Sequence, residues 1–229
     1  RASPKLVRSV YCLIAVAILP WVIWNGFIQQ LNSEWNDLVL RLRPPTAYSQ
    51  ALGQIVLLAI DDRTAAKYGP LPLNRRTLAT AMQVLAEAQP RVLAVDLLLS
   101  APGDAAADEA LALALRRYPR LTLGAARLFL GAGRPLEQLD SVTLGSIRLP
   151  ASHADNRLLF INYAGPEGTF QRVSFADLIE RRAEPASFQN KLVILGVTAQ
   201  GGGERIFTPV SSGIGMSGIE IHANVIRTI

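Results

Sequence analysis

Three aspartates that follow apolar runs are the residues best suited to chemistry. Asp61 and Asp62 end the run IVLLAIDD, and Asp96 lies near the end of the run VLAVDLLL. If the two runs are neighbouring parallel strands, their carboxylates meet at the carboxyl edge of a sheet, where open α/β sheets bind ligands. Carboxylate oxygens suit Mg²⁺ and Ca²⁺. The three aspartates are therefore candidate ligands of a divalent cation, and no other cofactor is indicated.

The same aspartates have a structural alternative. An aspartate directly before a helix accepts hydrogen bonds from the amides of the first helical turn. Arg63, Arg75 and Arg76 are close enough along the chain to pair with carboxylates. Both interpretations stay open at this point.

Five more polar residues join the aspartates as candidate ligand-binding residues. They are Asn74, Arg75, Thr208, Glu220 and His222, together with the Gly-rich loop that leads up to Thr208. Asn74 also suits the cap of the helix that follows it. His222 stands beside Glu220 in IEIHAN and could act as a general base, although a packed or capping histidine is the alternative.

The chain offers no self-standing catalytic set. It lacks a Gly-x-Ser-x-Gly nucleophile elbow. Its Gly-rich loop is not a Walker motif, because Gly203 is followed by Glu204 and Arg205. The single cysteine, Cys12, lies inside an apolar stretch. We therefore expect no catalytic residues and no enzymatic activity in this part of the protein.

From residue 55 onward, strands and helices alternate, which predicts an α/β fold. The continuous apolar runs are typical of strands covered on both faces of a sheet. Strands are predicted over residues 55–62, 92–99, 120–128, 158–165 and 191–198, and helices over 77–88, 106–118, 174–182 and 219–229. Residues 129–157 are expected to form an insertion with one or two short strands. This order predicts a mostly parallel or mixed sheet flanked by helices.

The N-terminal part predicts one transmembrane helix. Residues 10–28 carry no charge and would span roughly 28 Å as a helix, about one hydrocarbon core. Arg1, Lys5 and Arg8 precede this stretch and favour a cytoplasmic N-terminus. A cleavable signal peptide and a buried core helix are the alternatives.

Residues 31–43 keep the spacing of a helix with one apolar face and are expected to form a stalk. Pro44 and Pro45 end it. The predicted organisation is thus a cytoplasmic stub and membrane helix over 1–30, followed by an extracytoplasmic α/β domain over 31–229.

Composition excludes several classes of protein. Half of the 229 residues are hydrophobic and 18% are charged, which excludes a disordered chain. One cysteine excludes an intramolecular disulfide. The net charge is +5, but the bases beyond residue 50 are scattered rather than gathered in a stripe, so we expect no nucleic-acid partner.

Five blocks of the sequence, in this order, resemble the cyclase- and histidine-kinase-associated sensory extracellular domain of the second type. The blocks are IVLLAIDDRT, YGPLPLNRRTLATAMQVLAEAQPRVLAVDLLLS, DAAADEALALAL, KLVILGVTAQGGGERIFTPV and MSGIEIHANVI. The resemblance covers residues 31–229. It implies a bacterial transmembrane receptor whose last helix leads to further membrane helices. It also implies a cytoplasmic output such as a histidine kinase, a nucleotide cyclase or a Ser/Thr kinase.

The sequence is therefore interpreted as a sensory input domain in the bacterial inner membrane. The expected partners are the membrane, a second copy of the chain and an unidentified small-molecule or protein stimulus. Two other functions stay open: a membrane-tethered, metal-dependent hydrolase that uses Asp61, Asp62 and Asp96, and an assembly domain without a ligand.

Overall fold

A computed structural model describes residues 34–35, 38–40, 42, 52–97, 104–118, 136–144, 146–150, 161–211 and 213–228. The chain divides into two compact units, Arg1–Arg43 and Pro44–Ile229. In the first unit, the described residues are helical, and the apolar side chains of Trp35, Leu38, Val39 and Leu42 are exposed. The predicted membrane span over 10–28 lies outside the described residues. Among the residues that are described, no helix is long and apolar enough to cross a bilayer.

The second unit is built on a parallel four-stranded sheet, as predicted. Its strands are β1 (Ile55–Ile60), β2 (Val92–Asp96), β6 (Gln171–Ser174) and β7 (Leu192–Val197), in the spatial order β2-β7-β1-β6. Every residue of β1 is buried, because both faces of the sheet are covered. The parallel pairings align Ile60 with Val197 and Asp96 with Gly196, so these strands end at a common carboxyl edge.

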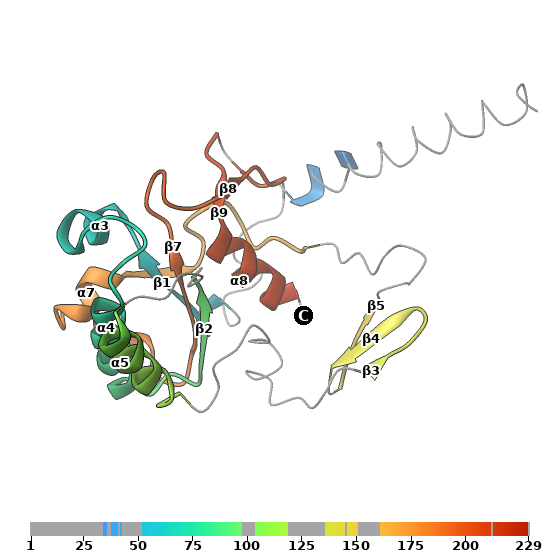
Figure 1. The fold of residues 1–229 in the computed structure, drawn as a ribbon. Helices are drawn as coiled ribbons and strands as arrows, with labels where there is room; N and C mark the ends of the chain where they lie inside the picture. Colours follow the sequence, from blue (N-terminus) through green and yellow to red (C-terminus); the bar gives the residue numbers. More distant parts are fainter. Residues whose placement is uncertain are drawn as a thin grey trace, which may run out of the picture. The chain divides into compact units, whose positions relative to one another are not determined.

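Helices cover the two faces unequally (Figure 1). On one face lie α4 (Arg75–Glu87), α5 (Ala105–Leu115) and α7 (Phe175–Ile179); on the other lies α8 (Gly218–Thr228). Successive side chains of β1 point to opposite faces of the sheet, so β1 contributes to the core on both sides. Val56, Leu58 and Ile60 pack in the cluster with α4, α5 and α7, whereas Ile55 and Leu57 pack in the cluster with α8.

The predicted helix over 77–88 is confirmed as α4, and its cap is the predicted one. Asn74 accepts a hydrogen bond from the Arg76 amide at 2.8 Å. Leu78, Met82 and Leu85 are buried against the sheet, as their spacing predicts. The predicted helices over 106–118, 174–182 and 219–229 are found as α5, α7 and α8, with shifted ends.

Two elements escape the sequence prediction. Helix α3 (Asp62–Tyr68) begins directly after β1, where the strand was expected to continue through Asp62. Strand β6 begins with exposed polar residues and lies at the edge of the sheet. Neither segment carries a long apolar run, so the pattern that reveals buried elements is weak in both.

The strand predicted over 158–165 is not formed by residues 161–165. Their backbone bonds instead to side chains of α8. The Asn162 amide donates to Thr228 Oγ1 at 2.9 Å, and the Ala164 amide donates to Asn224 Oδ1 at 2.8 Å. The strand predicted over 120–128 lies outside the described residues.

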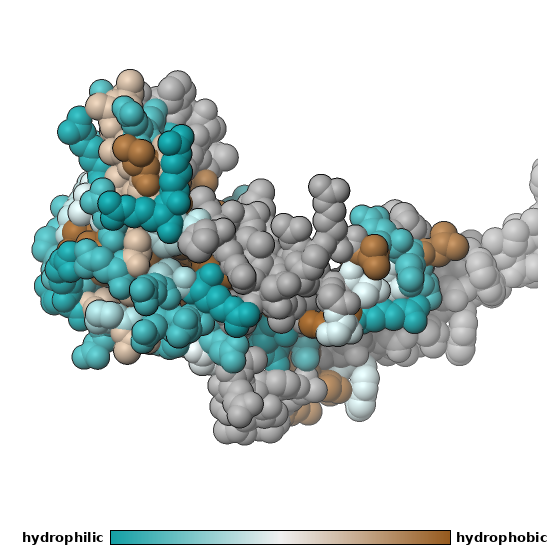
Figure 2. Space-filling model, turned by 90° about the horizontal axis from the view of Figure 1, so that it is seen from below, coloured by the Kyte–Doolittle hydropathy of each residue, from teal (hydrophilic) through white to brown (hydrophobic). Residues whose placement is uncertain are grey.

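Small antiparallel sheets complete the unit. The predicted insertion contains β3 (Leu136–Glu137), β4 (Ser141–Leu144) and β5 (Ile147–Pro150), and β8 (Arg205–Ile206) pairs with β9 (Met216–Ser217). A single-turn 3-10 helix spans Pro185–Ser187. Seen from below, the described surface is largely hydrophilic, and hydrophobic residues lie on it in small separate groups (Figure 2).

Candidate functional site

A cavity of about 870 Å³ lies at the carboxyl edge of the sheet. Its floor includes Ile60 and Val197, the last residues of β1 and β7, and Asp96, the last residue of β2. The segment before α4, the Gly-rich loop after β7 and helix α8 supply the walls. The lining residues are Ile60, Leu71, Pro72, Leu73, Leu78, Asp96, Leu97, Val197, Gly201, Gly202, Gly203, Glu204, Ile206, Gly218, Ile221 and His222.

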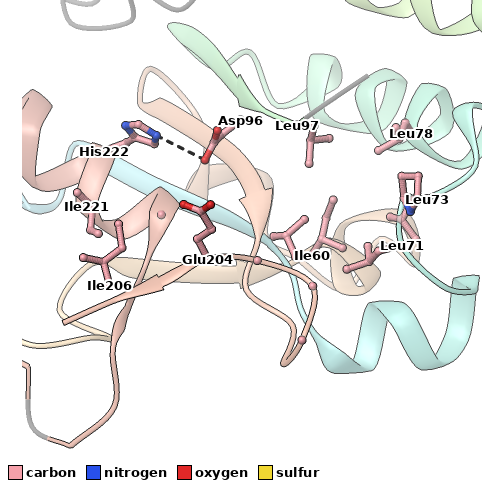
Figure 3. A pocket seen from close by; sticks show the side chains of 16 residues that line it. Ile60, Leu71, Leu73, Leu78, Asp96, Leu97, Glu204, Ile206, Ile221 and His222 are labelled. Carbon is pink, nitrogen blue, oxygen red and sulfur yellow. Dashed lines mark ion pairs between the residues drawn. The ribbon is translucent and has the colours of Figure 1, made fainter. Parts of the chain in front are cut away.

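Three polar side chains meet in this mainly apolar cavity (Figure 3). Asp96 Oδ2 and His222 Nε2 are 3.6 Å apart and join the end of β2 to α8. Their side chains are 46% and 57% exposed, so water reaches the pair. The carboxylate of Glu204 points into the same space from the loop.

Glu204 has no neutralising partner among the residues that the structure describes, although a cation follows it directly. The Arg205 guanidinium turns the other way. It donates to the carbonyls of Gly215 at 3.0 Å and Thr198 at 3.1 Å and lies 3.8 Å from Glu167. The charge of Glu204 is therefore left facing the cavity.

The glycines of the loop allow it to lie against the cavity wall. A Cβ on Gly202 would overlap the Leu71 side chain, and one on Gly203 would lie 3.1 Å from the Val197 carbonyl oxygen. A side chain at either position would push against these atoms, so the glycines let the loop lie this close to the wall. The Gly-rich loop thus shapes an apolar wall rather than a phosphate cradle.

Helix α8 is held on the domain by a buried carboxylate. Glu220 is fully buried and accepts hydrogen bonds from the amides of Gly168 at 2.9 Å and Thr169 at 2.8 Å. The Arg172 guanidinium lies 2.7 Å from both Glu220 and Glu167. This network ties the helix that lines the cavity to the segment leading into β6.

The pKa values of the two carboxyls in this network are shifted in opposite directions. Burial raises the pKa of Glu220, and the neighbouring Glu167 carboxylate adds to that rise. Burial also acts on Glu167, but hydrogen bonds from the Ser217 amide and from Arg172 outweigh it and lower the pKa of that carboxyl. Acidification therefore protonates Glu220 before Glu167.

The sequence profile of the CHASE2 domain matches residues 13–134 and 116–229 of this chain. The chain belongs to the CHASE2 family. CHASE2, the cyclase/histidine kinase associated sensory extracellular domain 2, is a sensory domain of signalling receptors and is not itself catalytic. CHASE2 domains are typically extracytoplasmic parts of membrane receptors. No curated protein and no solved structure matches the chain in these comparisons.

The structure of this CHASE2 domain does not gather the three aspartates. Strand β7 lies between β1 and β2, so the predicted neighbouring strands are separated by roughly 10 Å. In the described part of the chain, no three His, Cys, Asp or Glu residues form a group that could hold a metal ion. Asp61, Asp62 and Asp96, the candidate cation ligands, therefore do not form one three-carboxylate group in the described part of the chain.

Asp61 and Asp62 serve the local structure of the CHASE2 domain. Asp61 caps α3, accepting from the Thr64 amide at 2.9 Å and the Thr64 hydroxyl at 2.6 Å, and also accepts from the Ser174 hydroxyl at 3.1 Å. Asp62 accepts from the Gln200 amide at 2.7 Å. The alternative interpretation of these acids as caps holds for Asp61.

The other predicted residues divide between the cavity and the framework. Asp96 and His222 line the cavity. Arg75 pairs with Asp108 at 3.0 Å, and Thr208 bonds to the Ser211 hydroxyl at 3.0 Å. With Asn74 as a cap and Glu220 buried, these residues fulfil structural roles in the described chain.

The Gly-rich loop that contains Glu204 is among the predicted ligand-binding segments, but Glu204 itself is not among the predicted residues. The sequence prediction also missed Glu167 and Arg172, the partners of Glu220 and α8. A pattern-based signal existed only for Glu220, an acid on the buried face of a helix. Arg172 is 48 residues away from Glu220 in the sequence. No local sequence pattern therefore links Glu220 to its partners.

Proposed function

We propose that this CHASE2 domain is the extracytoplasmic input domain of a bacterial transmembrane receptor and that its stimulus binds in the cavity at the carboxyl edge. The observation that carries the proposal is the double role of α8. Gly218, Ile221 and His222 line the cavity, while Glu220 on the same helix is anchored to the domain. A ligand in the cavity therefore contacts the element that ends the described fold.

Such a ligand acts by differential affinity. It shifts the domain between two arrangements only to the extent that it binds one of them better. The Asp96–His222 contact is where occupancy would be sensed first, because both residues line the cavity and their contact joins the sheet to α8.

The receptor setting includes three further features: a cytoplasmic N-terminus, a second copy of the chain and a cytoplasmic output. Membership of the CHASE2 family supports the receptor setting. The exposed apolar side chains of Trp35, Leu38, Val39 and Leu42 support pairing of two chains through the stalk. The output is a histidine kinase, a nucleotide cyclase or a Ser/Thr kinase.

Cysteine labelling tests the location. In a Cys12→Ser background, a cysteine is placed at the exposed Glu109 of α5. A membrane-impermeant maleimide added to intact cells should label Glu109→Cys. Labelling only after the cells are broken would contradict an extracytoplasmic domain.

Thermal unfolding of residues 1–229 in lipid nanodiscs, against a panel of small metabolites, tests the sensing site. A ligand that binds the folded state raises the midpoint with the logarithm of its concentration. Leu71→Trp fills the cavity and should abolish the shift. Leu113→Trp, on an exposed face of α5 and outside the cavity, should keep it. A shift that survives Leu71→Trp would place the ligand elsewhere.

A further inference from the structure

We infer that the cavity takes a small amphipathic organic cation, an amine whose ammonium group lies between Glu204 and Asp96 and whose apolar part lies against the leucine wall. This inference rests on the proposed function, because it assigns the chemical class of the ligand of that same cavity. Three observations carry it: the charges that line the cavity, the ion pairs of Arg205 and Arg172, and the apolar wall.

The polar lining is acidic. Asp96 and Glu204 contribute two carboxylates, and the described lining residues include no lysine or arginine. His222 is the one titratable base among these described residues, and it already faces Asp96. Both acidic residues are exposed, with 46% of the Asp96 side chain accessible, so each carboxylate would attract a cation with the modest strength of a surface charge pair. The cavity therefore favours a positively charged guest.

Arg205 and Arg172 do not reverse this sign. Arg205 turns toward Gly215, Thr198 and Glu167, and Arg172 pairs with Glu167 and Glu220. Both guanidinium groups belong to the network that anchors α8, and neither lines the cavity.

The N-terminus of α8 is also no anion site. A helix N-terminus attracts negative charge, but the chain supplies that charge itself. Glu167 Oε2 accepts from the Ser217 amide at 3.0 Å. Asp96 Oδ2 lies so close that a Cβ on Gly218, the first residue of α8, would be 3.7 Å from it. An anionic ligand would meet carboxylates where it needs donors.

The two acids of the cavity differ in what already balances them. Asp96 has His222 at 3.6 Å and the N-terminus of α8 beside it. Glu204 has neither, and its carboxylate points into the cavity (Figure 3). Glu204 is therefore the main contact of the ammonium group, and Asp96 is the second.

The remaining lining requires an apolar body. Leu71, Leu73, Leu78 and Leu97 lie together on the side of the cavity away from His222 (Figure 3). The volume of about 870 Å³ falls within the range of small-molecule sites, which are mostly apolar with a few placed polar groups. A bare metal ion would leave this wall unused.

Calorimetric titration of residues 1–229 in nanodiscs tests the sign of the charge. The probes are 3-phenylpropylammonium, 3-phenylpropanol and 3-phenylpropanoate, which share one apolar body, and empty nanodiscs correct for lipid partitioning. The ammonium probe should bind most tightly and lose affinity with added salt, because screening weakens charge pairs. Equal affinity for the alcohol, or a preference for the carboxylate, would overturn the inference.

Two variants make the assignment specific to Glu204. Glu204→Gln should weaken the ammonium probe by about three- to fivefold, the value of a partly exposed charge pair, and leave the alcohol unchanged. Glu109→Gln removes an exposed carboxylate outside the cavity and should change neither. An ammonium affinity unaffected by Glu204→Gln would also overturn the inference.

The two proposals fail in distinguishable ways. If Leu71→Trp blocks a metabolite that is neutral or anionic, the cavity is the sensing site and only the cation assignment is wrong. If the ammonium probe binds equally to Leu71→Trp, the probe does not use the cavity and the cation assignment is wrong. If a metabolite shift also survives Leu71→Trp, the sensing-site proposal is wrong as well.

Discussion

Acidic residues that look alike in the sequence perform different tasks in the folded domain. Asp61 caps a helix, Asp96 faces a histidine at the cavity, and Glu220 is buried in a network of amides and arginine. The difference lies in what each carboxylate meets: backbone donors, a half-exposed imidazole, or backbone amides and a guanidinium whose side chain is 31% exposed. Substitution of the acids with structural roles should therefore change the stability of the fold, whereas substitution of those that line the cavity should change ligand binding.

Asp61→Ala should lower the free energy of unfolding by about 1–2 kcal/mol, since it removes an N-cap. It also removes the acceptor of the Thr64 and Ser174 hydroxyls. Asp61→Asn keeps a capping oxygen and should cost clearly less. Urea unfolding of both variants measures the difference. Equal losses would show that the charge, rather than the cap, matters at this position.

Glu220→Gln should reveal the raised pKa of the buried carboxyl. A group whose pKa is raised on folding contributes stability that is present below its unfolded pKa and is lost as pH rises through the folded pKa. Glutamine does not titrate. The free energy of unfolding of the wild type minus that of the variant should therefore be larger below pH 4.5, the unperturbed value, than near neutral pH.

Urea unfolding across this pH range measures the effect. The exposed Glu109→Gln serves as the matched control and should show no comparable trend. A wild-type advantage that grows with pH would contradict the raised pKa of Glu220.

At the scale of elements, the contact between α8 and the sheet depends on one small residue. Gly196 lies in β7, and a Cβ there would overlap the Ile219 side chain and approach the Asp96 carbonyl oxygen to 3.3 Å. Ile219 is 1% exposed and cannot swing into solvent. The glycine thus sets the distance at which α8 packs beside the cavity.

Gly196→Ala should therefore destabilise the domain by about 1–3 kcal/mol, the usual cost of overpacking a core. Gly218→Ala is the matched control, because its Cβ would make only an ordinary contact at 3.7 Å. Alanine is also the better helix former. Thermal unfolding of the two variants gives the comparison. A Gly196→Ala variant as stable as Gly218→Ala would show that α8 can shift without cost.

At the scale of the whole molecule, the fold is a sheet between two unequal helical layers. Among the described elements of the second unit, α4, α5 and α7 share one face, and α8, with the segment bonded to it, lies on the other. The cavity opens where this thinner layer meets the strand ends. Among the described helices, α8 is the one that both lines the cavity and covers this face, so a ligand in the cavity contacts it directly.

Deleting residues 218–229 should abolish cooperative folding of the domain. It exposes Leu57, Leu192 and Ile194, which are at most 1% exposed in the folded chain. Near-ultraviolet circular dichroism and urea unfolding of the truncated and intact chains provide the measurement. A truncated chain with a cooperative transition and native near-ultraviolet signal would show that α8 is dispensable for the fold.

The local sequence determined the class of the fold and most of its buried elements. Continuous apolar runs predicted β1, β2 and β7, and the spacing of Leu78, Met82 and Leu85 predicted the buried face of α4, because burial on both faces or on one leaves a periodic signal. The Asn74 cap could be predicted from residue type, because asparagine is preferred directly before a helix. The family could also be recognised from the order of five sequence blocks.

Only the tertiary structure decided which residues meet. The three buried strands are similarly apolar, so nothing in their patterns says that β7 lies between β1 and β2. That order places β7 between the strand that ends before Asp61 and Asp62 and the strand that ends at Asp96, so the three candidate ligands are not gathered into one group in the described chain. The same order brings Asp96, Glu204 and His222 from three distant segments to one cavity. Hydrophobic patterning specifies burial, whereas the choice of neighbours depends on long-range packing, and the candidate site was decided by that packing.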